Sequence, residues 1–131
     1  MPGITIVIVD DEPDVVLFLQ TALEDNGYTT LTASNAVDAL KIIRETKPGL
    51  VCLDILMPEE SGISLFQKIR GDSDLQDIPV IIHSGLNLSR DLESVDFLHL
   101  EDGTVIPEPN GFIEKPIDPD RFLNLVRRVL G

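Results

Sequence analysis

The sequence is poor in cysteine, in long apolar runs and in basic side chains, and each shortage argues against a class of protein. Its one cysteine cannot form a disulfide within the chain, which fits a reducing compartment. No apolar stretch approaches the roughly 18–20 residues that cross a bilayer, and no basic segment precedes the first apolar run as it does in a signal peptide. We therefore expect a soluble cytoplasmic protein that makes no membrane contact.

Basic side chains are outnumbered by acidic ones. The chain has 10 Lys and Arg against 23 Asp and Glu, a formal net charge of −13. Non-specific binding to nucleic acid needs basic patches that displace counterions from phosphates. We therefore expect no direct contact with nucleic acid, whereas a basic protein partner, or carboxylates gathered around a cation, fit this charge.

What is present has the composition of one globular domain. The 131 residues are 43% hydrophobic and 25% charged, as is usual for such domains. No internal repeat, low-complexity tract or interdomain linker interrupts the sequence. These features predict a single domain over residues 1–131, of which residues 85–110 have the least regular pattern.

The most informative stretch is LVCLDILMPEESG, residues 50–62. Its four leading apolar residues run straight into Asp54, which is typical of a strand buried on both faces of a parallel sheet. Pro58 and Gly62 then favour a turn. The pattern places Asp54 at the carboxyl end of a central strand, where open α/β sheets bind their ligands, and predicts a buried structural role for Cys52.

Strand-like and helix-like patterns alternate along the whole chain. Strands are expected at residues 4–9, 29–32, 50–54, 79–84 and 111–114, with amphipathic helices between most of them and a last helix after Asp118. Ser34 or Asn35 and Asp118 are the expected helix caps. The alternation predicts a doubly wound α/β fold, (βα)₅, with a parallel sheet in the order 2-1-3-4-5 and helices on both faces. A helix over 90–100 and a loop over 101–110 are the weakest assignments.

Polar residues of complementary kinds follow four of the expected strands. Asp10 and Asp11 end the first strand, Asp54 the third and Ser84 the fourth, while Lys115 follows the fifth. The carboxyl ends of parallel strands share one edge, so these side chains should converge. Three clustered carboxylates repel one another unless a cation is present, and hard oxygen ligands favour Mg²⁺.

A cation held by Asp10 and Asp11 leaves Asp54 available as a nucleophile, and carboxylates do form aspartyl-phosphate intermediates. Lys115 and the cation would stabilise charge on the phosphoryl oxygens, and Ser84 can donate a hydrogen bond to them. The residues therefore predict a phosphoacceptor site.

Four motifs carry a resemblance to a known family: IVIVDDE (residues 6–12), LDILMPEESG (53–62), IIHSG (81–85) and GFIEKP (111–116). In this order and over essentially the whole chain, they resemble the receiver domain of two-component response regulators, the CheY-like superfamily. The resemblance implies a flavodoxin-like three-layer sandwich. It also implies that Asp54 accepts a phosphoryl group from the phosphohistidine of a sensor histidine kinase or a phosphotransfer protein.

The resemblance further implies a set of cation ligands. Asp11 would bind Mg²⁺ (or Mn²⁺) directly and Asp10 mainly through water. Asp54 and the backbone carbonyl of Leu56 would complete the ligands that the protein supplies.

The same resemblance implies a switch. Lys115 would contact the phosphoryl group, Ser84 would move toward it, and Phe112 would turn inward in response. The surface of the fourth helix, fifth strand and fifth helix would then change for a downstream protein, a fused output domain or a second copy in a homodimer. Such a chain is a regulatory domain that only assists its own phosphorylation and dephosphorylation, not an enzyme acting on other substrates. The separation of Ser84 from Lys115 is longer than the family usually needs, so the fourth helix is expected to be displaced or recast.

Two rival functions stay open. The first is an interaction module of the same fold that works without phosphorylation, and the unusual region 85–110 keeps it open. The second is a Mg²⁺-dependent phosphohydrolase with an aspartyl-phosphate intermediate, although Asp10-Asp11-Glu12 does not match the Asp-x-Asp-x-Thr pattern of the haloacid-dehalogenase-like enzymes. The sequence also fits both a stand-alone regulator and a receiver that is part of a longer chain.

Single residues have simpler interpretations. His83 and His99 are expected to be structural or exposed, because a site built on Asp and Lys does not require histidine. Glu12 is read as a solvated charge at a helix start. Phe112 is either an ordinary core residue or a switch, and the sequence does not separate these two.

Overall fold

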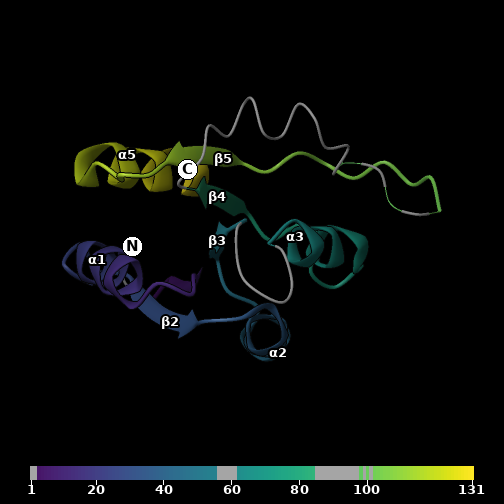
Figure 1. Cartoon of the computed structure of the whole chain (residues 1–131), viewed down its shortest axis with the longest axis horizontal. Helices are drawn as coiled ribbons and strands as arrows, with labels where there is room; N and C mark the ends of the chain where they lie inside the picture. The colour runs from purple at the N-terminus through teal and green to yellow at the C-terminus, as the bar shows by residue number, and fades with distance from the viewer. Residues whose placement is uncertain (1–2, 56–61, 85–97, 99, 101) are drawn as a thin grey trace.

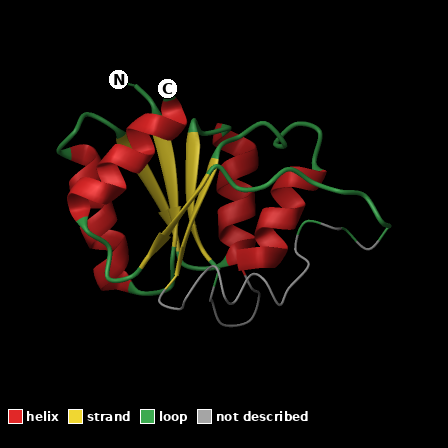
Figure 2. Ribbon diagram, turned by 90° about the horizontal axis from the view of Figure 1, so that it is seen from above, coloured by secondary structure: helices red, strands yellow, loops and turns green. Residues whose placement is uncertain are grey.

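Five parallel strands and the helices on both of their faces form three layers. The computed structural model describes residues 3–55, 62–84, 98, 100 and 102–131. Within these, α1 and α5 cover one face of the sheet, and α2 and α3 cover the other (Figure 1; Figure 2). This is the doubly wound α/β architecture that the alternating pattern predicts.

The sheet has the predicted strand order, β2-β1-β3-β4-β5. The bounds are β1 Thr5–Val9, β2 Thr29–Ala33, β3 Leu50–Asp54, β4 Val80–Ser84 and β5 Gly111–Glu114. All four pairings are parallel, and the register sets Asp54 beside His83 and Ser84 beside Glu114. Order and direction together give the flavodoxin-like topology.

The helices are α1 Pro13–Glu24, α2 Ala36–Thr46, α3 Gly62–Gly71 and α5 Pro119–Leu130. The Asn35 side chain caps α2 by accepting from the N–H of Asp38 at 2.8 Å, and Asp118 caps α5 by accepting from Arg121 N–H at 2.9 Å. Both caps were predicted, and they satisfy backbone donors that the first turn leaves free. The helix expected over 90–100 lies mostly outside the described residues, and the two described positions, Leu98 and Leu100, are not helical.

Two apolar clusters sandwich the sheet, because side chains on a strand point alternately to opposite faces. Val51, Leu53 and Ile82 pack with α2 and α3, whereas Cys52 and Ile81 pack with α1 and α5. Cys52 is buried as predicted, and burial raises the pKa of its thiol to about 12. The sheet is therefore covered on both faces, as its nearly continuous apolar strands require.

The described part of the segment before β5 packs beside α3. Ile106 N–H donates to the Leu98 carbonyl at 2.8 Å, and Leu100 N–H donates to the Thr104 carbonyl at 2.8 Å. Ile106 is buried in the cluster on the α2–α3 face, and Leu98 and Leu100 pack against it. The loop predicted over 101–110 is thus anchored to the core on that face.

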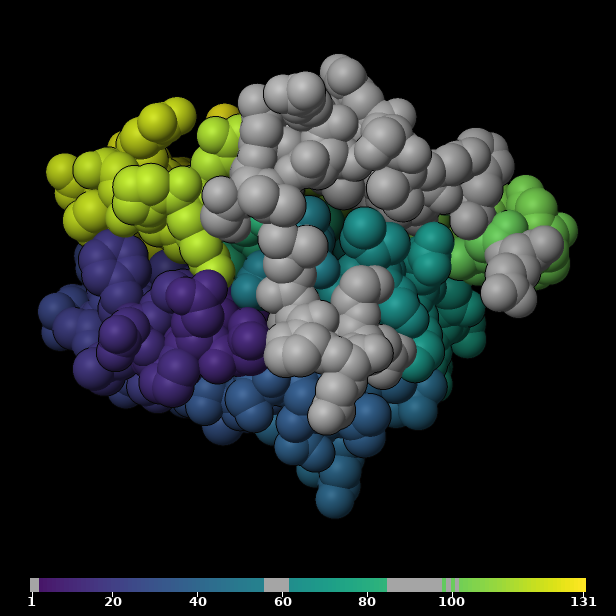
Figure 3. Space-filling model, viewed as in Figure 1, coloured from purple at the N-terminus to yellow at the C-terminus, as the bar shows by residue number. Residues whose placement is uncertain are grey.

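The described N-terminal and C-terminal portions of the chain lie on one side of the molecule. In the space-filling view the N-terminal and C-terminal portions, purple and yellow, occupy the same side of the molecule (Figure 3). Contacts between α1 and α5 join them there.

Candidate functional site: an acidic cluster at the sheet edge

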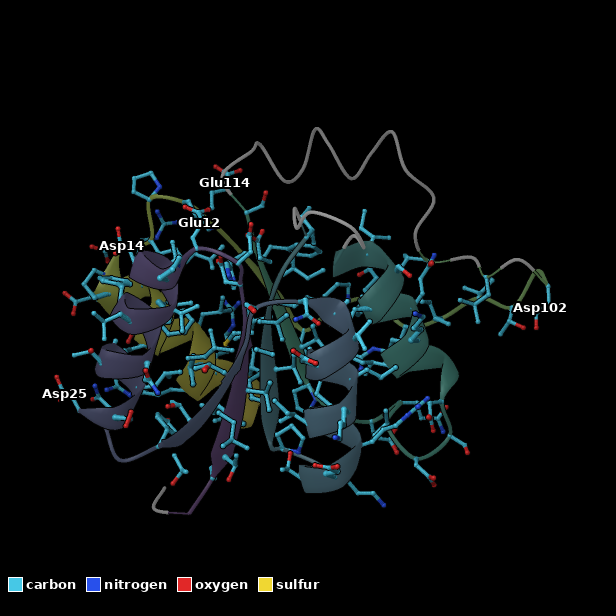
Figure 4. The ribbon with its side chains drawn as sticks, turned by 60° about the horizontal axis from the view of Figure 1, so that its bottom comes forward. Glu12, Asp14, Asp25, Asp102 and Glu114 are labelled. Atoms are coloured by element: carbon cyan, nitrogen blue, oxygen red, sulfur yellow. The ribbon has the colours of Figure 1, made fainter. Side chains whose placement is uncertain are left out.

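The carboxyl ends of β1, β3, β4 and β5 bring the predicted site residues to one edge of the sheet. Glu12 and Asp14, which follow β1, and Glu114, which ends β5, lie at this edge, and Asp25 lies at the opposite end of α1 (Figure 4). The parallel register alone produces this convergence, since every strand of the sheet ends on the same side.

Asp54 ends β3 in a nearly closed environment. Its residue is 2% exposed, and alternation along β3 directs its side chain to the same face as Cys52, the face covered by α1 and α5. Gly62 closes over the end of the strand, donating its N–H to the Ile55 carbonyl at 3.1 Å. A Cβ at position 62 would stand 2.1 Å from the Asp54 carbonyl oxygen, so only glycine fits there.

Asp10, which follows β1, is 1% exposed and has protein donors on both carboxylate oxygens. Its Oδ1 accepts the backbone N–H of Glu12 at 2.8 Å. Its Oδ2 lies 2.9 Å from Nε2 of His83 and 3.1 Å from Nζ of Lys115. A buried carboxylate needs such donors, because burial without them would be very costly.

Lys115 bridges three carboxylates at the ends of two strands, β1 and β3. Its Nζ lies 3.1 Å from Asp10 Oδ2, 3.0 Å from Glu12 Oε1 and 3.4 Å from Asp54 Oδ2. The backbone N–H of Lys115 donates to the Ser84 carbonyl at 2.7 Å, and this hydrogen bond holds the Lys115 backbone beside the end of β4. The Lys115–Pro116 peptide bond is cis.

The pKa values of two of these groups are displaced in the directions that favour their charged forms. Burial would raise the pKa of Asp10, but hydrogen bonds from His83, Glu12 N–H and Lys115 outweigh it, so the pKa falls below 3.8. Burial would lower the pKa of Lys115, but Glu12 and Asp10, with the charge of Asp54, raise it above 10.5. At neutral pH the edge therefore holds a buried, charged network.

Four carboxylates have oxygens close enough together to hold one metal ion. Asp10, Asp11, Glu12 and Asp54 each offer an oxygen, and these four atoms all lie within 4.8 Å of one another. An all-oxygen set with three aspartates and one glutamate suits a hard cation such as Mg²⁺. The donor chemistry of the residues thus fits the cation that the sequence predicts.

Ser84 and Phe112 occupy different surroundings. Ser84 is fully buried at the end of β4, at the same edge as Asp54. Phe112 is 43% exposed on β5, so the interpretation of this side chain as an ordinary core residue is wrong. Leu56, whose carbonyl is an expected ligand, and His99 lie outside the described residues.

Two residues of the network were not predicted as site residues. His83 reaches Asp10, and Glu12 forms an ion pair with Lys115 although its own side chain is 61% exposed. The one sequence signal for a role of His83 in the site was its position, a polar residue in an apolar strand directly before Ser84. Glu12 sits beside the predicted acidic pair, and only the position of Lys115 shows what it contacts.

Comparison with known proteins decides the family. The model of the response regulator receiver domain matches residues 6–127. The chain belongs to this family. Receiver domains of two-component response regulators serve as phosphoacceptors, generally bind Mg²⁺ in an acidic pocket and act with histidine kinases and output domains.

Individual relatives agree with this assignment. The chain is 30% identical over 131 residues to the polar-differentiation response regulator DivK of Brucella anthropi, covering 100% of this chain and 98% of that protein. It is 33% identical to the response regulator Rre1 of Synechocystis, covering 98% of this chain and 52% of that protein. Among solved structures, the signal receiver domain of a signal transduction histidine kinase from Syntrophus aciditrophicus is 32% identical, with a TM-score of 0.82 over 98% of this chain and 90% of that one.

None of the helices within the described ranges has the length and apolar character needed to cross a bilayer.

Proposed function

We propose that this receiver domain takes a phosphoryl group onto Asp54 from the phosphohistidine of a sensor histidine kinase or phosphotransfer protein. One observation carries the proposal. Asp54 is a buried carboxylate grouped within 4.8 Å of three others, with the Lys115 ammonium 3.4 Å from its Oδ2. A carboxylate so placed has both a cation site and a positive side chain where phosphoryl charge would develop.

In the reaction, a carboxylate oxygen of Asp54 forms a bond to phosphorus while the P–N bond of the donor breaks, and the electron pair of that bond leaves with the imidazole. Lys115 donates a hydrogen bond to a phosphoryl oxygen, as Ser84 does from the end of β4. Asp10, Asp11, Asp54 and the backbone carbonyl of Leu56 would hold Mg²⁺ or Mn²⁺. The cation supplies positive charge that offsets the charge of the carboxylates and the phosphoryl group.

The hydrogen bonds that the Asp10 oxygens accept support different roles for Asp10 and Asp11 in binding the cation. Both oxygens of Asp10 already accept hydrogen bonds from the protein. Asp11 is half-buried and belongs to the same cluster. Asp11 is therefore the better direct ligand, and Asp10 acts mainly through water.

The output surface in this proposal is that of the fourth helix, displaced or recast, together with β5 and α5. Exposed Phe112 on β5 supports it, since an aromatic side chain there is available to repack when Ser84 moves. A downstream protein or a fused output domain would recognise the surface, and a homodimer through it is a further form of output. No role on nucleic acid or membranes is proposed, and the domain 1–131 acts in the cytoplasm as a regulator rather than as an enzyme on other substrates.

Incubation with acetyl phosphate and Mg²⁺ tests the proposal. We expect a stable adduct of one phosphoryl group, labile to hydroxylamine as acyl phosphates are, detected by intact mass and mapped to Asp54. Asp54→Asn should abolish it, and Asp25→Asn, which changes an exposed carboxyl at the far end of α1, should leave it intact.

Other outcomes would favour the rivals. Continuous release of phosphate from small phosphate esters, with turnover far above one per chain, indicates the phosphohydrolase. No adduct and no turnover, in a folded protein, indicates an interaction module that works without phosphorylation.

A further inference from the structure

His83 lies beside the phosphoacceptor Asp54 in the sheet, and the proposed reaction does not use it. It is fully buried, and the register of the sheet pairs it with Asp54 on the neighbouring strand β3. Alternation along β4 sets its side chain on the same face as Ile81, the face covered by α1 and α5. Asp54 projects to that same face, so the side chains of His83 and Asp54 lie on the same side of the sheet.

The imidazole connects two strands that do not touch. Its Nε2 lies 2.9 Å from Oδ2 of Asp10, at the end of β1, although β3 separates β1 from β4 in the sheet. Its Nδ1 is buried and has no hydrogen-bond partner among the described residues. An ionised carboxylate can only accept, so Nε2 donates its proton to Asp10, and Nδ1 faces no acceptor among the described residues.

The hydrogen bond from His83 to Asp10 Oδ2 differs from the contact that Lys115 makes with the same oxygen. Lys115 also donates to Asp10 Oδ2, but its ammonium is shared with Glu12 and Asp54 and sits on a flexible stem. In the proposed reaction that ammonium turns to a phosphoryl oxygen. His83, packed on all sides, is then the side-chain donor that stays on Asp10.

We propose that His83 is a positioning residue of the cation site, holding the Asp10 carboxylate in its orientation toward the acidic cluster whether or not Lys115 is engaged. The inference rests on the proposed cation site at Asp10, Asp11 and Asp54. A donor behind a carboxylate fixes its orientation, and behind a direct ligand its loss typically weakens metal binding by about 10–100-fold. Asp10 acts mainly through water, so the lower end of that range is expected for His83.

Titration of the full chain with MgCl₂ alone, followed by calorimetry or by amide NMR shifts, tests the inference. We expect His83→Leu to raise the Mg²⁺ dissociation constant about tenfold. His83→Gln places an amide N–H at nearly the reach of Nε2 and should hold the constant within about threefold of wild type. Ile81→Val, on the same strand and face but without contact to Asp10, should lose stability and keep wild-type Mg²⁺ affinity.

A second measurement needs no metal and no variant. Nitrogen-15 NMR of the histidine side chains, without Mg²⁺, should show a proton on Nε2 of His83, with its exchange with water slowed by burial. The other tautomer would overturn the inference even if His83→Leu failed to fold. So would a folded His83→Leu that binds Mg²⁺ as tightly as wild type, or a His83→Gln as weak as His83→Leu.

Failure of the wider proposal gives a different result. A wild-type chain that binds no Mg²⁺, while His83 shows the Nε2 tautomer, contradicts the cation site itself. If the His83 variants bind Mg²⁺ as tightly as wild type, the positioning role of His83 is contradicted. The proposal that Asp54 accepts a phosphoryl group is then unaffected.

Discussion

Gly62 shows how a single atom can decide the geometry beside Asp54. The chain turns back onto the end of β3 so tightly that the Gly62 Cα approaches the Asp54 and Ile55 backbone. The motif made this residue look like a turn former, but the structure shows that close approach, rather than an unusual backbone angle, requires glycine.

Gly62→Ala should destabilise the protein by about 3 kcal/mol, the upper range for overpacking, because the new Cβ would meet backbone that cannot move aside like a side chain. The control is Gly71→Ala, whose Cβ would lie 3.4 Å from Leu100 Cδ1, an ordinary contact; its change should stay within about 1 kcal/mol. Urea denaturation of both variants measures the difference, and equal stabilities would contradict the steric account.

The Asp10 carboxyl predicts how stability changes in acid. Its pKa is lower in the folded protein than its ordinary value of 3.8, because hydrogen bonds from His83 and Glu12 N–H outweigh the opposing effect of burial. Such a group stabilises the fold above its unfolded pKa, and this contribution is lost as the pH falls through the folded value. The free energy of unfolding should therefore drop below about pH 4.

Asp10→Asn should flatten this acid dependence when urea denaturation is repeated from neutral pH down to about pH 3. Asp25→Asn removes one carboxyl at the far end of α1 and should keep the wild-type slope, as a control for the change in net charge. An identical slope for Asp10→Asn and wild type would show that Asp10 does not supply the pH dependence.

At the scale of elements, Arg70 joins α3 to the start of β4 and to the segment before β5. The guanidinium is almost fully buried, donates to the Ile78 and Gln76 carbonyls at 2.6 and 3.1 Å, and stacks over Phe66 with its carbon 5.2 Å from the ring centroid. It also donates to Asn110 Oδ1 at 2.8 Å, an oxygen that accepts Val80 N–H at 3.0 Å as well. One amide thus anchors the long segment in place before β5 begins.

Asn110→Ala should cost about 1–3 kcal/mol, because it leaves a buried cationic donor and a backbone N–H without their acceptor. Hydrogen exchange at the amides of residues 102–110 should quicken more than exchange in β1. Arg44→Ala is the matched control, since its pair with Asp72 is 3.5 Å long and more than half exposed on the Arg44 side, and it should cost less than about 1 kcal/mol. A cost for Asn110→Ala no larger than that of Arg44→Ala would contradict the anchor.

At the scale of the whole molecule, the net charge of −13 and the four clustered carboxylates act on stability in different ways. Repulsion over the acidic surface weakens in any salt. A cation site responds to Mg²⁺ in particular, because a ligand that binds only the folded state stabilises it by mass action.

Adding MgCl₂ at about ten times its dissociation constant should raise the free energy of unfolding by about 1.4 kcal/mol beyond the effect of NaCl at matched ionic strength. Thermal or urea denaturation measures both. Asp11→Asn should reduce the response to that of NaCl alone. A wild-type response that is the same in the two salts would contradict the Mg²⁺ site.

The sequence by itself determined the order of elements, the parallel sheet and most of the acidic site. Apolar runs that end in Asp10, Asp54 and Ser84 are typical of strands buried on both faces of a parallel sheet, and a parallel sheet gathers its carboxyl ends at one edge. The helix caps at Asn35 and Asp118 could also be predicted from the sequence, because each capping contact joins residues only three positions apart.

Only the tertiary structure decided the contacts that cross between elements. The hydrogen bond between His83 and Asp10 crosses β3, which lies between β4, the strand of His83, and β1, which Asp10 follows. The Glu12–Lys115 pair joins residues 103 positions apart. The Arg70–Asn110 anchor likewise depends on how α3 and the segment before β5 pack together, and the exposure of Phe112 is known only from the folded surface. Sequence patterns record which face a side chain takes, but the distance between two side chains on one face follows from packing.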